Sequence, residues 1–246
     1  MRTALIFVAI TLFGCGSAEG DDRIRLDVVA ASSLTEVFEA IAIEFETSNA
    51  SIDIAFSFGA SSEIAAAIES GASPDLIAVA EPSVLDALMS DDHVVEPVQY
   101  FATNRMEIVV PNGNPKDIAS LGDLARSDLV VLLCDPAVPC GRYSSQVLAN
   151  AGVRIAPASF EVNVKGVLGK VALGEADAGI VYVTDVLAAK ERVDGVAIPK
   201  DKNVVAQYPI AIVERSSDQQ EAERFVAFLT SEIGVRILRR HGFGAP

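Results

Sequence analysis

One stretch of the sequence decides the predicted fold: Ile24-Arg25-Leu26-Asp27-Val28-Val29-Ala30-Ala31-Ser32-Ser33-Leu34-Thr35-Glu36. Residues 24–29 have the composition of a strand. Apolar residues then recur at helical spacing and give one apolar face to a helix over residues 34–47: Leu34, Val37, Phe38, Ile41 and Phe45. A short apolar run followed by an amphipathic helix is the repeating unit of a parallel sheet with crossover helices.

The same alternation continues along the chain. A second strand is predicted at residues 52–58, then a short helix at 63–70 that stops at Gly71, a third strand at 76–80 and a helix opened by Pro82. A second α/β unit follows, with strands at 106–110, 129–134 and 178–183 and helices near 121–126, 143–150 and 164–173. One more strand, at 210–213, and two helices end the chain.

No Gly/Ser-rich linker separates the two α/β units, which favours two domains joined by extended crossings near residues 103–107 and 205–209. We expect domain I to comprise residues 24–104 together with 208–246, and domain II residues 105–207. The predicted fold class is therefore α/β, with two lobes that are each a mainly parallel sheet flanked by helices.

The first residues have the pattern of an export signal. Arg2 precedes an apolar run at residues 4–13 that is too short to span a bilayer. Leu12-Phe13-Gly14-Cys15 resembles a bacterial lipobox, which implies that residues 1–14 are a signal peptide, that Cys15 is acylated and that residues 15–23 form a tether. The alternative is an ordinary secretory signal. Either way we expect an exported protein, periplasmic or on the cell surface, and membrane contact only through the lipid on Cys15.

The charge balance excludes one class of partner. The chain has 19 Lys and Arg residues against 34 Asp and Glu, a formal net charge of −15. Nucleic acid is excluded because its phosphates would be repelled. For the same reason, an anionic ligand would have to be held by local dipoles and hydroxyl groups rather than by the overall field.

Cys134 and Cys140 remain once Cys15 is assigned to the lipid, and an oxidising compartment favours a disulfide between them. The loop is short, so the bond would add only roughly 2 kcal/mol of stability, and its main effect would be to stiffen residues 135–139. Two free thiols, or a metal-binding pair, are the alternatives.

Serines occupy the turns where two of the predicted strands lead into helices. Ser33 and Glu36 have the spacing of a capping box, and Ser61 follows the second strand in a similar arrangement. Free backbone N–H groups and a hydroxyl at the positive end of a helix make an anion site. Because ligands of open α/β sheets bind at the carboxyl ends of the strands, the two turns together indicate a binding site.

A set of short segments spread along the chain is distinctive when taken together: Ala30-Ala31-Ser32-Ser33-Leu34-Thr35, Ser57-Phe58-Gly59-Ala60-Ser61-Ser62, Gly71-Ala72-Ser73-Pro74-Asp75-Leu76, Val138-Pro139-Cys140-Gly141-Arg142-Tyr143, Gly179-Ile180-Val181-Tyr182, Gln207-Tyr208-Pro209-Ile210-Ala211 and His241-Gly242-Phe243. In these segments, and in their order and spacing from about Leu26 to Phe243, the sequence resembles the periplasmic molybdate-binding proteins. The resemblance implies a type II periplasmic-binding-protein fold, with a tetrahedral oxyanion between the two domains.

The resemblance also assigns the residues of the site. Ser33 and Ser61 would each give a hydroxyl and a backbone N–H, Cys140 and Val164 would give backbone N–H groups, and Tyr182 would give its phenol hydroxyl. Cys140 stands where the family usually has alanine, but its contribution would come from the main chain. A Cys134–Cys140 bond would hold that amide in place before the ligand arrives and so lower the ordering cost of binding.

The resemblance implies a monomeric binding protein without enzymatic activity or cofactor, whose ligand is molybdate or tungstate and whose partner is the permease of an ABC transporter. Both anions are larger than sulfate and nearly equal to one another, so we expect sulfate to be rejected. A protein of the same fold for another oxyanion, such as sulfate or phosphate, is the first alternative.

A secreted hydrolase with Ser33 or Ser61 as its nucleophile is the alternative from another class. Neither serine lies in Gly-x-Ser-x-Gly, and His93 and His241 have no recognisable triad partners in the sequence. A lipoprotein with a purely structural role is the third interpretation, under which polar helix starts gathered in one cleft would be unnecessary.

Overall fold

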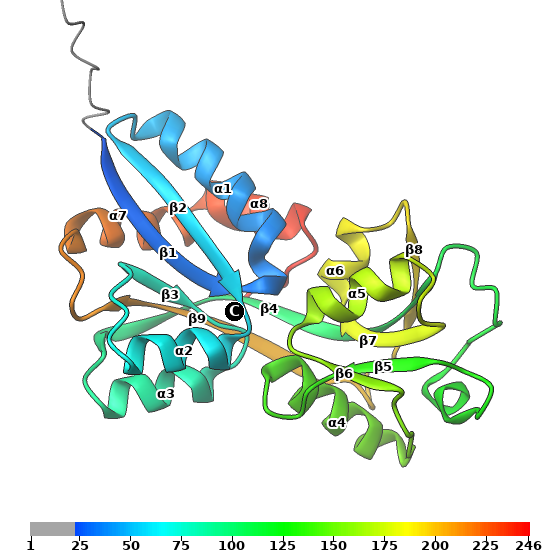
Figure 1. Ribbon diagram of the computed structural model, residues 1–246. Coiled ribbons are helices and arrows are strands. Elements are labelled where there is room, and N and C mark those ends of the chain that lie inside the picture. The colour runs from blue at the N-terminus through cyan, green and yellow to red at the C-terminus, as the bar shows by residue number, and fades with distance from the viewer. Residues whose placement is uncertain (1–22) are drawn as a thin grey trace, which may run out of the picture.

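A computed structural model describes residues 23–246, and they form two α/β halves joined by two long strands (Figure 1). The predicted signal peptide, residues 1–14, the predicted acylation site, Cys15, and all of the predicted tether except Arg23 lie outside the described residues. None of the described helices is both long and apolar enough to cross a bilayer.

The first half is built around three parallel strands, as the alternation predicted. They are β1 (Ile24–Ala31), β2 (Ile52–Gly59) and β3 (Leu76–Ala78), with β1 between the other two. Helical segments connect and cover them: η1 (Ser32–Leu34), α1 (Thr35–Ser48), α2 (Ser61–Glu69), α3 (Pro82–Ser90), α7 (Gln219–Leu229) and α8 (Glu232–Arg240).

The second half repeats this plan with β5 (Val131–Cys134), β6 (Ser159–Glu161) and β7 (Ala178–Tyr182), of which β5 is the parallel neighbour of the other two. The short strand β8 (Val193–Ala197) runs antiparallel at its edge. The helical segments of this half are η2 (Leu121–Ala125), α4 (Pro139–Ala151), α5 (Val164–Ala172) and α6 (Val183–Ala188).

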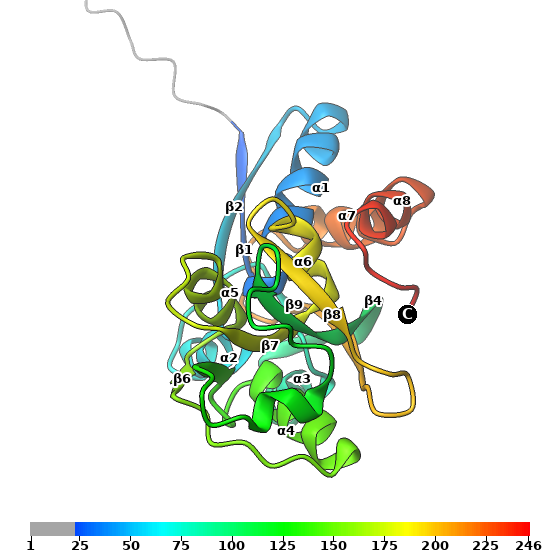
Figure 2. The ribbon, with the colours of Figure 1, turned by 90° about the vertical axis from the view of Figure 1, so that its right-hand side faces the viewer.

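Two antiparallel strands, β4 (Val94–Pro111) and β9 (Val205–Val213), run between the halves (Figures 1 and 2). β9 pairs with β3, and β4 pairs with β7 and β8, so the strand order is β2-β1-β3-β9-β4-β7-β5-β6. The expected parallel sheets therefore each carry antiparallel strands as well. The predicted domain limits, 104/105 and 207/208, fall inside β4 and β9, and this division stays a prediction.

Several elements differ from the sequence prediction for local reasons. Only residues 106–110 of β4 were predicted, because register shifts between Val95 and Gln99 and between Tyr100 and Ala102 break the alternation of its first part. The helix predicted near residues 121–126 is a 3-10 turn. β6, β8 and α6 were not predicted; they span only 3, 5 and 6 residues and give little periodic signal.

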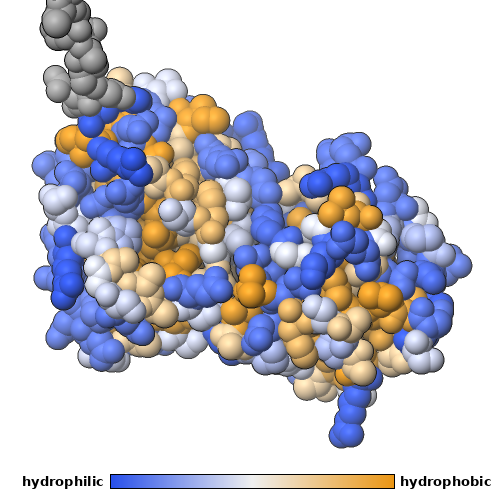
Figure 3. Space-filling model, viewed as in Figure 1, coloured by the Kyte–Doolittle hydropathy of each residue, from blue (hydrophilic) through white to orange (hydrophobic). Residues whose placement is uncertain are grey.

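The apolar face predicted for the first long helix is confirmed. Val37, Phe38, Ile41 and Phe45 are buried on α1, and the ring of Phe225 on α7 meets Phe38 and Phe45 edge-on at centroid distances of 6.0 and 5.4 Å. Burying each phenyl ring contributes about 1.5–3 kcal/mol. This packing fixes α1 against α7, and α1 continues directly from η1 and β1 at the edge where the sheet ends. Hydrophilic residues cover much of the outer face, with apolar residues in scattered patches (Figure 3).

Candidate functional site

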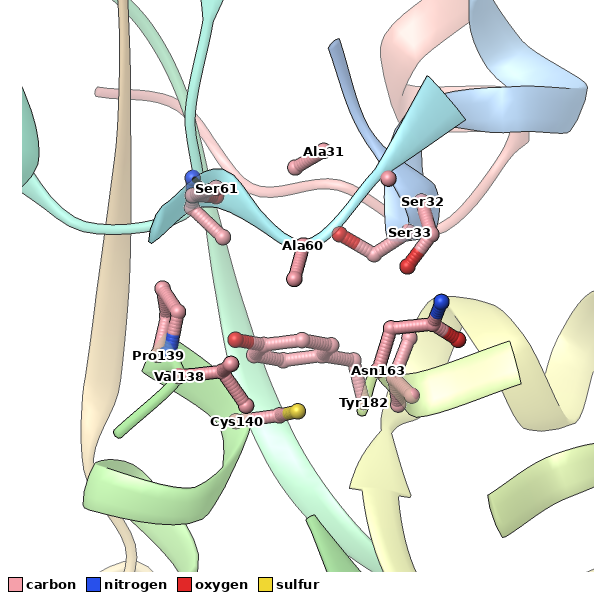
Figure 4. Close-up of a pocket in the computed structure, with 13 residues that line it drawn as sticks. Ala31, Ser32, Ser33, Ala60, Ser61, Val138, Pro139, Cys140, Asn163 and Tyr182 are labelled. Carbon is pink, nitrogen blue, oxygen red and sulfur yellow. Dashed lines mark hydrogen bonds between the residues drawn. The ribbon is translucent and has the colours of Figure 1, made fainter. Parts of the chain in front are cut away.

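A small pocket lies between the two halves, where strands end and helices begin. Its first wall comes from the first half and its second wall from the second half, and the two face each other across the pocket (Figure 4). The first wall is Ala31, Ser32, Ser33, Gly59, Ala60, Ser61 and Ala80; the second wall is Val138, Pro139, Cys140, Asn163, Val164 and Tyr182. The space is about 230 Å³ with its open mouth included. The pocket is therefore small, and it suits a small guest rather than an extended organic molecule.

All five residues that the sequence assigned to the site line this one pocket: Ser33, Ser61, Cys140, Val164 and Tyr182. They come from sequence positions as far apart as 33 and 182, and β1, β7 and three helix starts bring them together. The structure thus gathers the candidates, while their roles toward a ligand remain predictions.

The first wall contains three buried serines, Ser32, Ser33 and Ser61, and the hydroxyls of the last two are hydrogen-bonded. Ser33 lies in η1, which follows β1 directly, and Ser61 is the first residue of α2, separated from the end of β2 by one residue. Ser33 Oγ lies 2.9 Å from the hydroxyl oxygen of Tyr208 on β9, and Ser61 Oγ accepts a hydrogen bond of 3.2 Å from the backbone N–H of Ala80. Each hydroxyl is thereby held by a partner from outside its own helix.

The second wall supplies backbone N–H groups from two helix starts. Cys140 is the second residue of α4, after Pro139, and Val164 is the first residue of α5. The N–H groups of a helix's first turn have no acceptor within the helix, and they carry the positive end of its dipole. Together with α2, three helices direct their N-termini at the pocket, an arrangement that attracts an anion.

A disulfide fixes the start of α4. It joins Cys134 at the end of β5 to Cys140, whose Cα atoms are 5.8 Å apart. The chain between them is packed tightly, since a Cβ atom on Gly141 would lie 1.9 Å from the carbonyl oxygen of Asp135. The Cys140 amide is therefore held in position by a covalent bond and by a close backbone approach that only glycine allows.

Tyr182, at the end of β7, places a buried and unpartnered hydroxyl in the second wall. The residue is 1% exposed, and among the described residues its hydroxyl has no hydrogen-bond partner. Burial raises the pKa of the Tyr182 phenol well above its usual value, so the group is a neutral donor. A buried hydroxyl without a hydrogen-bond partner destabilises the folded protein unless a ligand or a water molecule forms a hydrogen bond with it.

None of the residues that line the pocket carries a positive charge. Two cations follow the second-wall amides closely in sequence, but carboxylates engage both. Lys165 Nζ lies 2.7 Å from Glu36 Oε1 on α1 and 3.1 Å from the buried Asp185 Oδ1. Burial lowers the pKa of Lys165, but the nearby Asp185 and Glu36 outweigh this effect and raise the pKa overall. The ammonium group therefore keeps its positive charge, and the carboxylates balance that charge.

The second cation, Arg142, is bound by Glu81, which directly precedes α3 of the first half. From the sequence alone, an arginine beside Cys140 could have been an anion clamp or a solvent-facing side chain. The structure shows neither arrangement, because the guanidinium forms an ion pair with Glu81 of the other half. Two ion pairs, Lys165–Glu36 and Arg142–Glu81, thus connect residues of the two halves that lie close in sequence to the pocket lining.

Sequence reasoning missed several residues that build the site. Asn163 caps α5 with its side-chain oxygen, which accepts a 3.1 Å bond from the N–H of Gly166, and its position before an apolar run was the available signal. The contribution of Tyr208 to the first wall had no sequence signal, because Ser33 is 175 residues away.

Among the described residues, neither candidate serine is paired with a histidine, and no metal-binding cluster occurs. Within residues 23–246, no hydrogen bond joins His93 or His241 to Ser33 or Ser61, although His241 and Ser33 both line a second cavity beside the pocket. The same part of the chain contains no group of three or more His, Cys, Asp or Glu residues that could hold a metal ion.

Comparison with known proteins agrees with this geometry. The model of a family described as bacterial extracellular solute-binding protein matches residues 26–244. The chain is 39% identical over 219 residues to the molybdate-binding protein ModA of Mycobacterium tuberculosis strain H37Rv, a match that covers 89% of this chain and 84% of the relative.

Two solved structures share the fold. The periplasmic molybdate-binding protein of Azotobacter vinelandii has a TM-score of 0.78 and 21% identity, covering 90% of this chain and 99% of that one. The sulfate-binding protein SubI from M. tuberculosis H37Rv has a TM-score of 0.82 and 18% identity, covering 90% and 86%. The chain therefore belongs to the bacterial extracellular solute-binding proteins and has the two-lobed type II fold of periplasmic binding proteins.

Proposed function

We propose that this protein captures molybdate, or the similar tungstate, outside the cytoplasm and delivers it to the permease of an ABC transporter. It is held at the membrane by a lipid on Cys15. The anion binds in the pocket between the two walls, in contact with the hydroxyls of Ser33, Ser61 and Tyr182 and the backbone N–H groups of Ser33, Ser61, Cys140 and Val164. The protein works as a monomer and without a cofactor.

The observation that carries this proposal is a pocket rich in donors and without a free cation. The orphan hydroxyl of Tyr182 lies within it, three helix N-termini face it, and both neighbouring cations are paired with carboxylates. Several neutral donors can replace the hydration shell of a dianion and spread its charge over many partial positive ends. The groups proposed to contact the anion are N–H and O–H donors, and the only lone pairs among them are those of the hydroxyl oxygens, which suits an oxyanion that carries no proton.

The choice of molybdate rests on relatedness in sequence. A protein named for molybdate binding is 39% identical over most of both chains. Fold likeness does not discriminate, because sulfate- and molybdate-binding structures have similar TM-scores against this chain. Sulfate is therefore the competing ligand. We expect size to separate the two, because molybdate is larger than sulfate and both walls have to reach the anion at once.

The test is calorimetry of the purified mature protein with molybdate, tungstate and sulfate. We expect molybdate and tungstate to bind tightly and with similar affinity, and sulfate to give no heat of binding. Tight binding of sulfate with no response to molybdate would overturn the proposal in favour of a sulfate carrier. Binding of none of the three would favour a structural lipoprotein.

The proposed anchor needs a separate measurement. Mass spectrometry of the protein extracted from its native membrane should find two modifications, cleavage before Cys15 and acyl chains on that residue. An exported protein that starts elsewhere, or carries no lipid, would contradict the anchor without affecting the ligand.

A further inference from the structure

The segment His241-Gly242-Phe243 near the C-terminus is one of those in which the chain resembles the molybdate-binding proteins, but the pocket is lined by other residues. It follows α8 directly. Gly242 has a φ of +89°, a left-handed conformation that ends the helix. Its N–H donates to the carbonyl of Arg239 at 3.1 Å, and the N–H of Phe243 donates to the carbonyl of Leu238 at 3.1 Å. The end of α8 therefore anchors the chain on the N-terminal side of Phe243.

The strand β4, which crosses between the halves, anchors the chain on the other side of Phe243. The N–H of Thr103 on β4 donates to the carbonyl of Gly244 at 3.0 Å, and the N–H of Gly244 donates back to the carbonyl of Thr103 at 2.9 Å. The Thr103 hydroxyl also donates to the carbonyl of Ala245 at 2.8 Å. Because its backbone is anchored on both sides, Phe243 has little freedom to move, and its ring is buried.

The ring of Phe243 packs edge-on against Tyr208. Their centroids are 5.5 Å apart at an interplanar angle of 89°, whereas the rings of Phe101 and Tyr182 lie 6.3 and 6.1 Å from Tyr208. Tyr208 is fully buried, and its hydroxyl oxygen lies 2.9 Å from Ser33 Oγ. This bond holds the Ser33 oxygen whichever of the two hydroxyls donates. A continuous series of contacts thus runs from the C-terminal segment to the first wall of the pocket.

Building on the proposed function, we infer that Phe243 is a positioning residue of the anion site, because its ring fixes Tyr208 and Tyr208 fixes the hydroxyl of Ser33. Removing the ring opens space beside Tyr208, into which the tyrosine ring can shift. The Ser33 hydroxyl then has to be ordered when the anion binds, and this ordering lowers the affinity. Ser61 does not depend on these contacts, because its hydroxyl accepts from the N–H of Ala80.

The test is a double-mutant cycle in the full mature protein, with molybdate affinity measured by calorimetry. We expect Phe243→Ala alone to lower the affinity by about tenfold. In a Ser33→Ala background no hydroxyl is left to misplace, so adding Phe243→Ala should lower the affinity by no more than about twofold. In a Ser61→Ala background the same change should still lower it by about tenfold. A purely structural role of Phe243 would not distinguish the two serines.

Phe45→Ala is the matched control for the loss of a buried ring. Phe45 is buried and meets the rings of Phe225 and Phe228 edge-on, both at 5.4 Å, and these three residues lie outside the pocket lining. We expect it to lower the stability of the protein but to leave molybdate affinity within about twofold of the unchanged protein. If Phe243→Ala folds poorly, Phe243→Leu keeps a large apolar side chain and should show the same dependence on Ser33, with a smaller loss of about threefold.

The possible results separate the two proposals. An equal loss from the Phe243 change with and without Ser33→Ala, an equal loss in Phe45→Ala, or unchanged affinity in both Phe243 variants would each overturn the positioning role while molybdate binding stands. If the unchanged protein does not bind molybdate at all, the proposed function fails first, and the positioning role fails with it.

Discussion

Ser33 and Ser61 in the first wall of the pocket have hydroxyls bonded to partners from the protein, whereas the one hydroxyl of the second wall has none. Ser33 is bonded to Tyr208 and Ser61 to the N–H of Ala80, but among the described residues Tyr182 Oη has no partner. The two serines assigned to the ligand are therefore held in place before it arrives. The second wall carries an unsatisfied buried group that a ligand would relieve, so removing a hydroxyl should have opposite effects on stability in the two walls.

Ser61→Ala should show the largest combined effect. The anion loses a donor and Ala80 loses its acceptor, so we expect molybdate affinity to fall by about tenfold to a hundredfold and the free energy of unfolding to fall by about 1–3 kcal/mol. Calorimetry and urea unfolding measure the two quantities. Ser62→Ala, at the next position of the same helix and outside the pocket lining, is the control and should change neither. If Ser61→Ala and the unchanged protein bound molybdate with equal affinity, Ser61 would not be one of the residues that bind the anion.

Tyr182→Phe should separate binding from stability. Molybdate affinity should fall by about tenfold, but the ligand-free protein should be as stable as the parent or up to about 1 kcal/mol more stable, since an unpaired buried hydroxyl is removed. Urea unfolding without ligand is the decisive measurement. A destabilisation as large as that of Ser61→Ala would mean that the Tyr182 hydroxyl has a partner in the free protein, and the contrast between the walls would be wrong.

Loss of the disulfide tests whether the second wall is ordered in advance. In the double variant Cys134→Ser, Cys140→Ser the start of α4 is no longer tied to β5. We expect the free energy of unfolding to fall by about 2 kcal/mol and molybdate affinity to fall by about threefold to tenfold, because ordering the Cys140 amide then opposes binding. The reduced parent protein is the matched control and should behave like the variant. Unchanged affinity in both would show that Gly141 packing alone holds the amide.

Glu81→Gln should have the smallest effect. It breaks the ion pair with Arg142 that connects the halves beside the pocket, and such partly exposed pairs contribute about 0–1 kcal/mol. We expect molybdate affinity to fall by no more than about fivefold and to become less sensitive to salt. Asp128→Asn, which breaks an ion pair with Arg126 inside the second half, is the control and should not affect affinity. A rise in affinity would mean that Arg142, once released, contacts the anion.

Features encoded by neighbouring residues could be predicted from the sequence. The apolar spacing of Val37, Phe38 and Ile41 gave the first helix, and serines directly after strands marked two helix starts of the pocket. The spacing also gave the helix at residues 164–173, but it placed the start of α4 near residue 143 instead of Pro139. The ligand roles of the Cys140 and Val164 amides and of Tyr182 were assigned through resemblance to a family, because a buried tyrosine at a strand end is ordinarily a packing residue.

Long-range partners could not be predicted. The hydrogen bond between Tyr208 and Ser33 joins residues 175 positions apart in the sequence, and the bond between Lys165 and Glu36 joins residues 129 positions apart. Contacts of this kind produce no local pattern in the sequence from which they could be predicted. Whether Arg142 is free or paired depends on Glu81, which only the packing of the two halves brings near. The neutrality of the site is therefore a property of the fold that local sequence patterns do not encode.

The central claim, that neutral donors from two walls hold the anion, is tested most directly by a crystal structure of the protein with molybdate. The account predicts a tetrahedral anion within hydrogen-bond distance of Ser33, Ser61, Cys140, Val164 and Tyr182, with Lys165 still on Glu36 and Asp185 and with Arg142 still on Glu81. An ammonium or guanidinium group in contact with the anion, or an empty pocket in crystals grown with molybdate, would contradict it.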